Sequence, residues 1–195
     1  MAGVSITVDD AAVISALDRI IQAGGEPPMD KIGSHLLFST QRRFEAQAGP
    51  GGVPWQRHAR STLAKMPAAR RAAPQLLRNR GRLYDSMVYE ATADTVEVGT
   101  NVKTARAHQL GVDIERPART QTIYRKFNAK TGKFDPKFIK RKRKQAVATE
   151  VAVGAHVIRI PARPFLGFDD DDRREVLAIV DDALREIPGV EGVSP

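Results

Sequence analysis

The apolar positions of the first fifty residues recur with the period of a helix. They fall every three or four residues after Asp9 and Asp10, and again in the series Ile32, Leu36, Thr40 and Phe44. This spacing puts them on one helix face, and the aspartates are residues that favour a helix N-cap. The break Gly-Gly-Glu-Pro-Pro at 24–28 separates the two patterns. We therefore expect one helix from about residue 11 and a second over 30–48, joined as a helical hairpin.

Strands are predicted where β-branched residues alternate with polar ones. Such stretches lie at 4–8, 86–92, 95–100 and 157–160, with Ala93-Asp94 as a tight turn between the second and third. Between them, residues 60–65 predict a helical turn, residues 66–74 a loop without regular structure, and residues 104–110 a helical turn ended by Gly111.

A last helix is predicted after the run Asp169–Asp172, because its apolar positions again share one face. These are Val176, Val180, Leu184 and Ile187. The aspartates at its start suit the positive end of the helix dipole, and this explains the run better than a cation site does. The fold class expected is α+β, with the N-terminal hairpin and the C-terminal helix packed on a small, mostly antiparallel sheet.

Composition limits the class of protein. Hydrophobic residues make up 42% and charged residues 28% of the 195 positions, which is typical of one globular domain spanning 1–195. There is no cysteine, so disulfides and thiol chemistry are excluded. No run of eighteen apolar residues occurs, so we expect neither a membrane span nor a signal peptide.

The charge is distributed unevenly along the chain. Residues 101–165 contain 16 Lys and Arg against 4 Asp and Glu, whereas residues 169–195 contain 3 against 9. We therefore interpret residues 112–156 as an insertion, a basic arm that forms either a β-arm or a loop. Its charge calls for an anionic partner, either nucleic acid or the acidic tail of a neighbouring copy.

Catalytic and metal-binding patterns are weak. The four histidines, His35, His58, His108 and His156, are at least 23 residues apart and form no local pair of metal ligands. We expect no enzyme activity, no cofactor and no metal site.

The basic arm mixes cations with aromatic residues over 124–144. This composition suits backbone neutralisation and base stacking, but it equally suits a hairpin whose aromatic rings pack on each other, or contact with a neighbour's acidic helix. The residues expected to make contacts are Tyr124, Arg125, Lys126, Lys137, Lys140, Arg141, Lys142, Arg143 and Lys144.

Three stretches together carry a resemblance to a known family. They are Pro50–Trp55 with Ser61–Lys65; Gly81-Arg82-Leu83 through Val98-Gly99-Thr100-Asn101 to His108-Gln109-Leu110-Gly111; and Pro-Ala-Arg-Pro-Phe-Leu-Gly at 161–167. In this order they resemble the tailed-phage virion morphogenesis proteins, the tail-completion family of Mu-like and P2-like phages and prophages. The resemblance spans about residues 30–187.

The resemblance implies a structural virion protein of the neck or tail end, made in the cytoplasm of the bacterial host. Copies would form a ring, expected to be a hexamer, that caps the tail tube and docks other neck or tail-tube proteins, with possible contact to packaged DNA and none to membrane. The runner-up is a nucleic-acid-binding module that uses residues 124–144.

Two further groups of residues are singled out by these motifs. Residues of the 161–167 motif, with the lone tryptophan, are expected either at a subunit interface or packing the last helix on the sheet: Trp55, Arg163, Pro164, Phe165 and Leu166. A structural role at turns is expected for Gly81, His108, Gln109 and Gly111, the two glycines ending helical turns and His108-Gln109 hydrogen bonding buried backbone.

Overall fold

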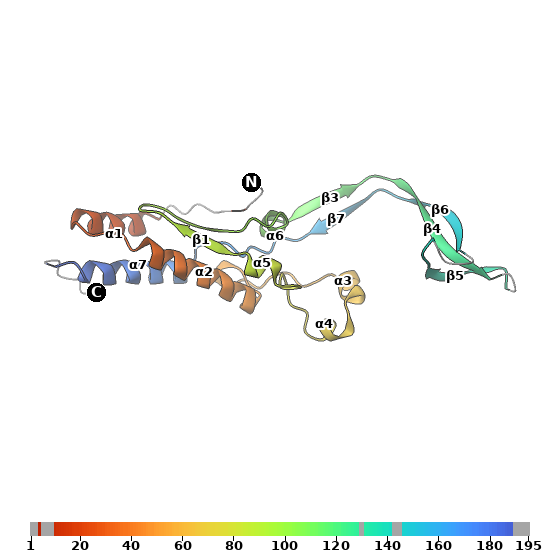
Figure 1. Cartoon of the computed structure of the whole chain (residues 1–195), viewed down its shortest axis with the longest axis horizontal. Helices are drawn as coiled ribbons and strands as arrows, with labels where there is room; N and C mark the ends of the chain where they lie inside the picture. Colours follow the sequence, from red (N-terminus) through yellow and green to blue (C-terminus); the bar gives the residue numbers. More distant parts are fainter. Residues whose placement is uncertain (1–3, 5–9, 129–130, 142–145, 189–195) are drawn as a thin grey trace. The chain divides into compact units, whose positions relative to one another are not determined.

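A computed structural model of the chain describes residue 4 and residues 10–128, 131–141 and 146–188. Helices and small antiparallel sheets are both present, with helices at the N-terminal side and one helix at the C-terminal side, so the α+β class is confirmed (Figure 1). The chain divides into two compact units. Unit 1 comprises Met1–Val112 and Pro161–Pro195, and unit 2 comprises Asp113–Ile160.

Unit 1 contains most of the helices. Its elements are α1 (Ala11–Gln22), α2 (Met29–Ala46), the 3-10 turn η1 (Pro50–Gly52), α3 (Arg60–Lys65), α4 (Ala68–Ala72), α5 (Arg82–Asp85), β1 (Val88–Ala91), β2 (Val96–Gly99), α6 (Ala105–Leu110) and α7 (Asp170–Arg185).

The long helices begin close to where the apolar period predicted. The Asp10 carboxylate caps α1 by accepting hydrogen bonds from the backbone N–H groups of Ala12 and Val13. The helix predicted over 30–48 is α2, which ends in a left-handed residue, Gln47. The strand predicted at 4–8 lies outside the described residues except for Val4, which forms an antiparallel bridge with Thr100.

Helix α2 packs against both α7 and the β1–β2 hairpin, and α1 packs on α7. One buried cluster joins the three helices through Ile20, Met29, Ile32, Val176, Val180 and Leu184. On the other side α2 approaches β1 closely, because a Cβ added at Gly33 would lie 2.3 Å from the Tyr89 ring. A larger residue at 33 would therefore push the hairpin away from the helix.

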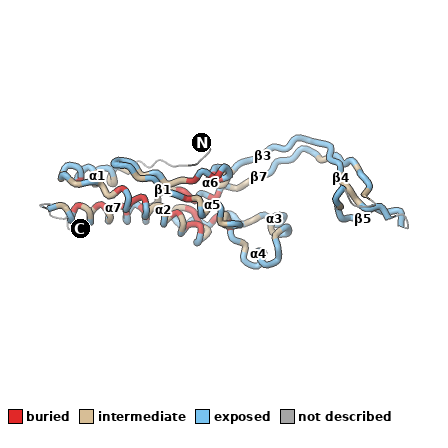
Figure 2. Tube along the Cα trace, viewed as in Figure 1, coloured by how far each residue is buried: buried red, intermediate tan, exposed pale blue. Residues whose placement is uncertain are grey.

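A second buried cluster surrounds the C-terminal half of α2. It contains Phe44, Trp55, Leu76, Leu83, Met87, Val102, Ala105, Phe165 and Leu166. Residues from five separate parts of the chain thus meet around one aromatic side chain, Phe44, which is fully buried. Figure 2 shows the buried positions gathered along α2, α5, α6 and α7.

The strands β1 and β2 form the predicted hairpin, with Val88 opposite Gly99 and Ala91 opposite Val96. Its turn is at 93–94, closed by a hydrogen bond from the Thr92 N–H to the Thr95 carbonyl. The prediction of an irregular loop over 66–74 is wrong, because Ala68–Ala72 forms the short helix α4. Pro67 precedes that helix and three of its residues are alanine, so local helix propensity explains it without an apolar face.

Unit 2 is built of strands alone among its described residues. They are β3 (Val112–Arg116, whose first residue closes unit 1), β4 (Arg119–Asn128), β5 (Lys133–Phe138), β6 (Ala146–Val153) and β7 (His156–Ile160). β3 pairs with β7, and β5, β4 and β6 form a three-stranded sheet in that order, antiparallel throughout. None of the described residues of 113–160 is buried.

Across the described part of the chain, no helix combines the length and apolar character that a bilayer crossing requires.

Candidate functional site

The segment 161–169, which includes the Pro-Ala-Arg-Pro-Phe-Leu-Gly motif, is held by side chains from several elements of unit 1. We call it the anchored segment. Its residues Phe165 and Leu166 are 0% and 3% exposed, and both belong to the aromatic cluster around Phe44. The Phe165 ring lies with its centroid 5.2 Å from that of Phe44. The segment therefore packs in the core of its own chain.

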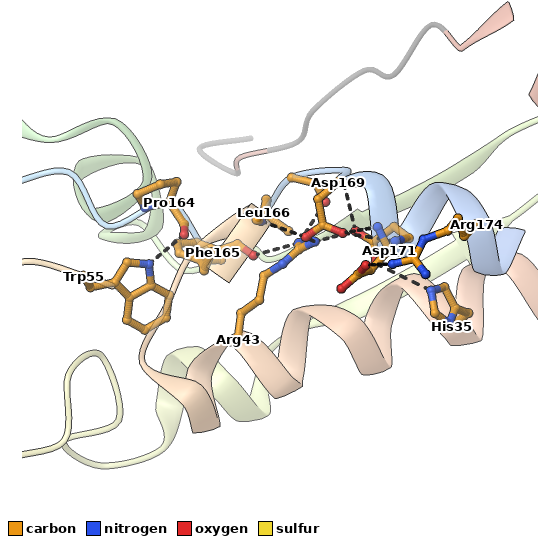
Figure 3. A network of polar contacts seen from close by, with 12 residues as sticks. His35, Arg43, Trp55, Pro164, Phe165, Leu166, Asp169, Asp171 and Arg174 are labelled. Atoms are coloured by element: carbon orange, nitrogen blue, oxygen red, sulfur yellow. Dashed lines mark hydrogen bonds and ion pairs between the residues drawn. The ribbon is translucent and has the colours of Figure 1, made fainter. Parts of the chain in front are cut away.

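Arg43 on α2 is the cationic centre of this site. Its side chain is 7% exposed, and it donates hydrogen bonds to the carbonyls of Phe165 (3.4 Å) and Gly167 (2.8 Å). The same guanidinium pairs with Asp169 at 3.0 Å and with the buried Asp172. Figure 3 shows Arg43 reaching from α2 toward Phe165 and Asp169. One buried charge thus ties α2, the anchored segment and the start of α7 together.

Asp169 is the N-cap of α7 and also forms an ion pair with Arg43. It forms a capping box with Asp172, and its Oδ2 also accepts a hydrogen bond from the Gly51 N–H at 3.0 Å. Burial disfavours the charged carboxylate. The hydrogen bonds from the N–H groups of Gly51 and Asp172, together with Arg43, outweigh this and lower the pKa of Asp169 to about 2. The predicted capping role of the aspartate run is confirmed.

Asp172 is 2% exposed, and a second basic side chain reaches it. The Nε2 atom of His35 on α2 lies 3.5 Å from the Asp172 Oδ1 atom, while Arg43 pairs with Oδ2. A buried carboxylate needs such compensation, because leaving it unpaired costs several kcal/mol, on the order of 3–5. The sequence placed His35 only among the histidines that form no local pair of metal ligands, and this contact gives it an acidic neighbour.

Trp55 and Gln109 hold the anchored segment by its backbone. The Trp55 Nε1–H donates to the Pro164 carbonyl at 2.8 Å, and its ring meets Phe44 edge-on at 5.6 Å. The Gln109 side chain accepts from the N–H groups of Phe165 (3.0 Å) and Leu166 (3.1 Å) and donates to the Leu166 carbonyl (2.8 Å). Gln109 therefore bonds to buried backbone, as predicted, although that backbone belongs to the anchored segment.

Arg163 anchors the other end of the segment. Its Nε–H donates to the Gln56 carbonyl at 2.8 Å, and its backbone N–H donates to the His108 carbonyl. Burial lowers the pKa of Arg163; burial, and then the charge of Arg163, lower the pKa of His108. His108 thus contributes its backbone carbonyl to the site, and its imidazole is disfavoured as a cation. The buried Nδ1 atom of His108 makes no hydrogen bond among the described residues, so the expected bond from this side chain to buried backbone is not found there.

The two glycines have the backbone conformation expected of them. Gly81 has φ of 73° and Gly111 has φ of 73°, values that other residues rarely adopt. Gly111 follows α6 as predicted. Gly81, in contrast, precedes α5 and caps its start, so the expectation that it ends a helical turn is wrong. The turn it makes is instead the entry to α5.

The residues expected at a subunit interface are mostly internal. Trp55, Arg163, Phe165 and Leu166 are between 0% and 7% exposed, whereas Pro164 is exposed. A contact between subunits through this motif stays a prediction.

The basic contact residues of unit 2 lie on β4, β5 and the segment after β5. Tyr124 and Arg125 are half-buried, whereas Lys126, Lys137, Lys140 and Arg141 are exposed. Lys142, Arg143 and Lys144 lie outside the described residues. The rings of Phe127 and Phe134 have centroids 5.2 Å apart, and Arg125 lies over the Phe138 ring at 5.3 Å. Phe127 and Phe134 thus pack on each other, as in the alternative of a hairpin with packed aromatic rings, whereas Phe138 packs against Arg125, a cation which that alternative left in solvent.

Three carboxylates of the acidic helix α7 pair with arginines of the same helix. Arg174 pairs with Asp171, and Arg185 pairs with Asp181 at 2.5 Å and with Asp182 at 3.6 Å. Arg173 pairs with Asp10, the N-cap of the neighbouring helix α1, at 2.8 Å. The helix still holds six Asp and Glu against three Arg, so it keeps a net negative charge.

The chemistry of the anchored segment is that of a brace. Its polar side chains hold carbonyls, N–H groups and one another, and within the described ranges no group of three or more His, Asp or Glu residues could hold a metal ion. Sequence reasoning missed Arg43 and its pairing with Asp172. The available signals were an arginine beside Phe44, which the apolar period places on the buried face of its helix, and the run of four aspartates.

Comparison with known proteins gives one match. Residues 8–185 match the phage virion morphogenesis family. No curated protein and no solved structure matches the chain.

Proposed function

Because this chain belongs to the phage virion morphogenesis family, we propose that it is a structural protein of the neck or tail end of the virion. Family membership itself gives a structural or assembly role in phage morphogenesis. The proposal adds the place and the mode of action: copies assemble into a ring, expected to be a hexamer, that completes the tail and offers a docking surface for head–tail joining.

The observation that best supports a structural role is how the polar side chains around the anchored segment are used. The polar atoms of Arg43, Trp55 and Gln109 hydrogen bond to the backbone of the anchored segment, and Arg43 also pairs with the aspartates that cap α7. A brace of this kind keeps one surface in a fixed shape, which is what a docking protein needs. The partners proposed are other copies of the chain and neighbouring neck or tail-tube proteins.

The proposal is tested by the state of the purified chain and by its place in the particle. Light scattering and negative-stain images of the full chain should show a closed ring, and a tag on the chain should label one end of the tail. Phage lacking the protein should accumulate heads and tails that do not join. A chain that stays monomeric at high concentration and is missing from purified virions would contradict the proposal.

A second function, nucleic-acid binding by unit 2, is favoured by one observation. Residues 113–160 contain 13 Lys and Arg against 4 Asp and Glu, a net charge of +9, and no described residue of the unit is buried. Such a surface binds polyanions with strong salt dependence. A gel shift of the full chain with duplex DNA at rising salt tests this, with Lys137→Gln/Lys140→Gln as the weakened variant.

A further inference from the structure

The two edges of the three-stranded sheet in unit 2 are built differently. The β5 edge contains Lys133, Asp135, Pro136 and Lys137, and charges with a proline are the usual protection of an edge strand against pairing. The β6 edge reads Ala-Val-Ala-Thr-Glu-Val-Ala-Val, with Glu150 as its one charge and no proline. An edge of eight residues with this composition is open to another strand.

The backbone groups available on β6 can be assigned from the ladder. The Ile139 N–H donates to the Tyr124 carbonyl at 2.9 Å, so the peptide groups of Tyr124 point toward the β5 side. Peptide groups alternate along a strand, so those of Ile123 and Arg125 point toward β6, where they face Thr149 and Val147. The outward groups of β6 are therefore those of the even-numbered residues, Ala148 and Glu150 at the centre.

One face of the same sheet gathers exposed apolar side chains among the described residues, with Gln121 and Arg125 of the central strand on the same face. Residues directly opposite each other share a face, which places Val147, Val151, Phe127, Phe134 and Phe138 together. Their exposed fractions run from 37% to 67%. A three-stranded sheet with no buried residue gains little from its own packing, so continuation into a larger sheet would stabilise it.

We propose that the β6 edge pairs with the β6 edge of a second copy of this chain, antiparallel, about a two-fold axis at Thr149. In this register Val147 lies opposite Val151 of the partner and Ala146 opposite Ala152. The outward groups of Ala148 face those of Glu150. The strand is nearly palindromic around Thr149, and this is what makes a second copy the fitting occupant.

Charge supports this register and this occupant. A pairing centred one residue later would put two Glu150 carboxylates opposite each other, whereas centring on Thr149 puts each beside alanine. Residues 124–144 are strongly basic, whereas β6 itself holds no Lys or Arg, so a second copy that pairs along β6 meets no cation within that strand. Each Glu150 would also share a sheet face with Lys126 of the other copy. In this register Glu150 lies opposite Ala148 of that copy, Ala148 lies opposite Tyr124, and Lys126 is two residues along β4 on the same face.

The β5 edge of a second copy is a poorer occupant, since Pro136 lacks an N–H and its neighbours are charged. The two-fold contact is closed, so it forms a pair and no ring. It therefore stands apart from the ring of the proposed function, and either can fail without the other.

Single cysteines test the register directly, because the natural chain has none. Thr149→Cys lies on the axis, where Cβ atoms of opposed residues are close enough for a disulfide. Thr122→Cys, on the central strand, is the matched control. Under mild oxidation Thr149→Cys should cross-link to a dimer at least about a hundredfold faster than the control, since paired positions have effective concentrations near millimolar. Equal rates in the two variants would overturn the proposal.

A backbone variant gives an independent measurement on the full chain. Ala148→Pro removes an outward N–H without touching the ladder to β4, whereas Ala148→Ser keeps that N–H. By sedimentation, the proline variant should dimerise about tenfold more weakly or worse, and the serine variant should match the natural chain. Equal association of the proline and serine variants would count against the edge.

Salt distinguishes the other occupants. Pairing of two basic units should hold or strengthen as salt is raised, because screening reduces their repulsion. Association that is lost at high salt would point to nucleic acid or to the acidic helix of a neighbour, and would overturn the pairing of β6 edges.

Discussion

Unit 1 and unit 2 of this chain obtain their order in different ways. Unit 1 has two buried clusters and, among its described residues, a buried ion network in which Arg43 donates hydrogen bonds to backbone carbonyls and to Asp169 and Asp172. Unit 2 is ordered among its described residues by strand pairing and surface aromatic contacts, with nothing buried. Deleting buried side chains should therefore lower the stability of unit 1. The order of unit 2 should depend instead on its backbone pairing and on its partners.

The largest expected effect is from Phe165→Ala. The ring is fully buried against Phe44, so its loss should lower the free energy of unfolding by about 3–5 kcal/mol. Urea unfolding followed by Trp55 fluorescence measures this, since Trp55 lies in the same cluster. A protein that unfolds at the same urea concentration as the natural chain would show that the cluster is not the source of stability in unit 1.

Arg43→Met should follow closely. Methionine fills similar space but leaves Asp172 buried without its main partner, which should cost about 3 kcal/mol at neutral pH. The double variant Arg43→Met/Asp172→Asn should recover part of the loss, because the orphaned charge is then gone. If the double variant is as unstable as the sum of its single changes, Arg43 and Asp172 act independently.

The pH dependence of unit 1 should come next in size. The pKa of Asp169 falls from 3.8 to about 2 on folding, so the carboxylate stabilises the protein above pH 4 and that contribution is lost as the pH falls toward 2. The expected loss is about 2 kcal/mol. Comparing the natural chain with Asp169→Asn between pH 5 and 2.5 measures it, as asparagine keeps the cap without titrating. Parallel curves for the two proteins would contradict this assignment.

The smallest effect is expected from Phe138→Ala in unit 2. Its ring is 67% exposed, and the visible contact is with Arg125, so unfolding should change by less than about 0.5 kcal/mol. Thermal unfolding beside Phe165→Ala makes the matched comparison. A large loss of stability here would mean that the apolar face of unit 2 is covered in solution.

The sequence predicted well those elements whose signal is local. The period of apolar residues located α1, α2 and α7, and the alternation before and after 93–94 located β1 and β2. The α4 helix at 68–72 was missed because it has no apolar face, and its alanines carry the only signal. Gly81 was placed on the wrong side of its helix because positive φ occurs at both ends of short helices.

The site was harder to predict, since it depends on contacts between distant segments. The sequence singled out the motif at 161–167 and Gln109, but it did not indicate that the Gln109 side chain hydrogen bonds to the backbone of the motif. The ion pair of Arg43 with Asp172 joins positions 129 residues apart, and no spacing rule links them. The sequence did not decide whether Phe165 and Leu166 lie in the core or at a subunit interface, because an apolar pair after a rigid Pro-Ala-Arg-Pro segment fits both places.

The hydrogen bond from the Arg163 N–H to the His108 carbonyl has a consequence for how the chain can be rebuilt. It joins two residues of unit 1 that are close in sequence to the places where the chain leaves this unit, after Val112, and re-enters it, at Pro161. An inserted segment whose ends are held together can change in length at a low cost in free energy, because doubling a flexible loop costs only about 0.6 kcal/mol of closure entropy. Unit 2 can therefore be shortened, exchanged or replaced by a short linker while the helical unit keeps its architecture.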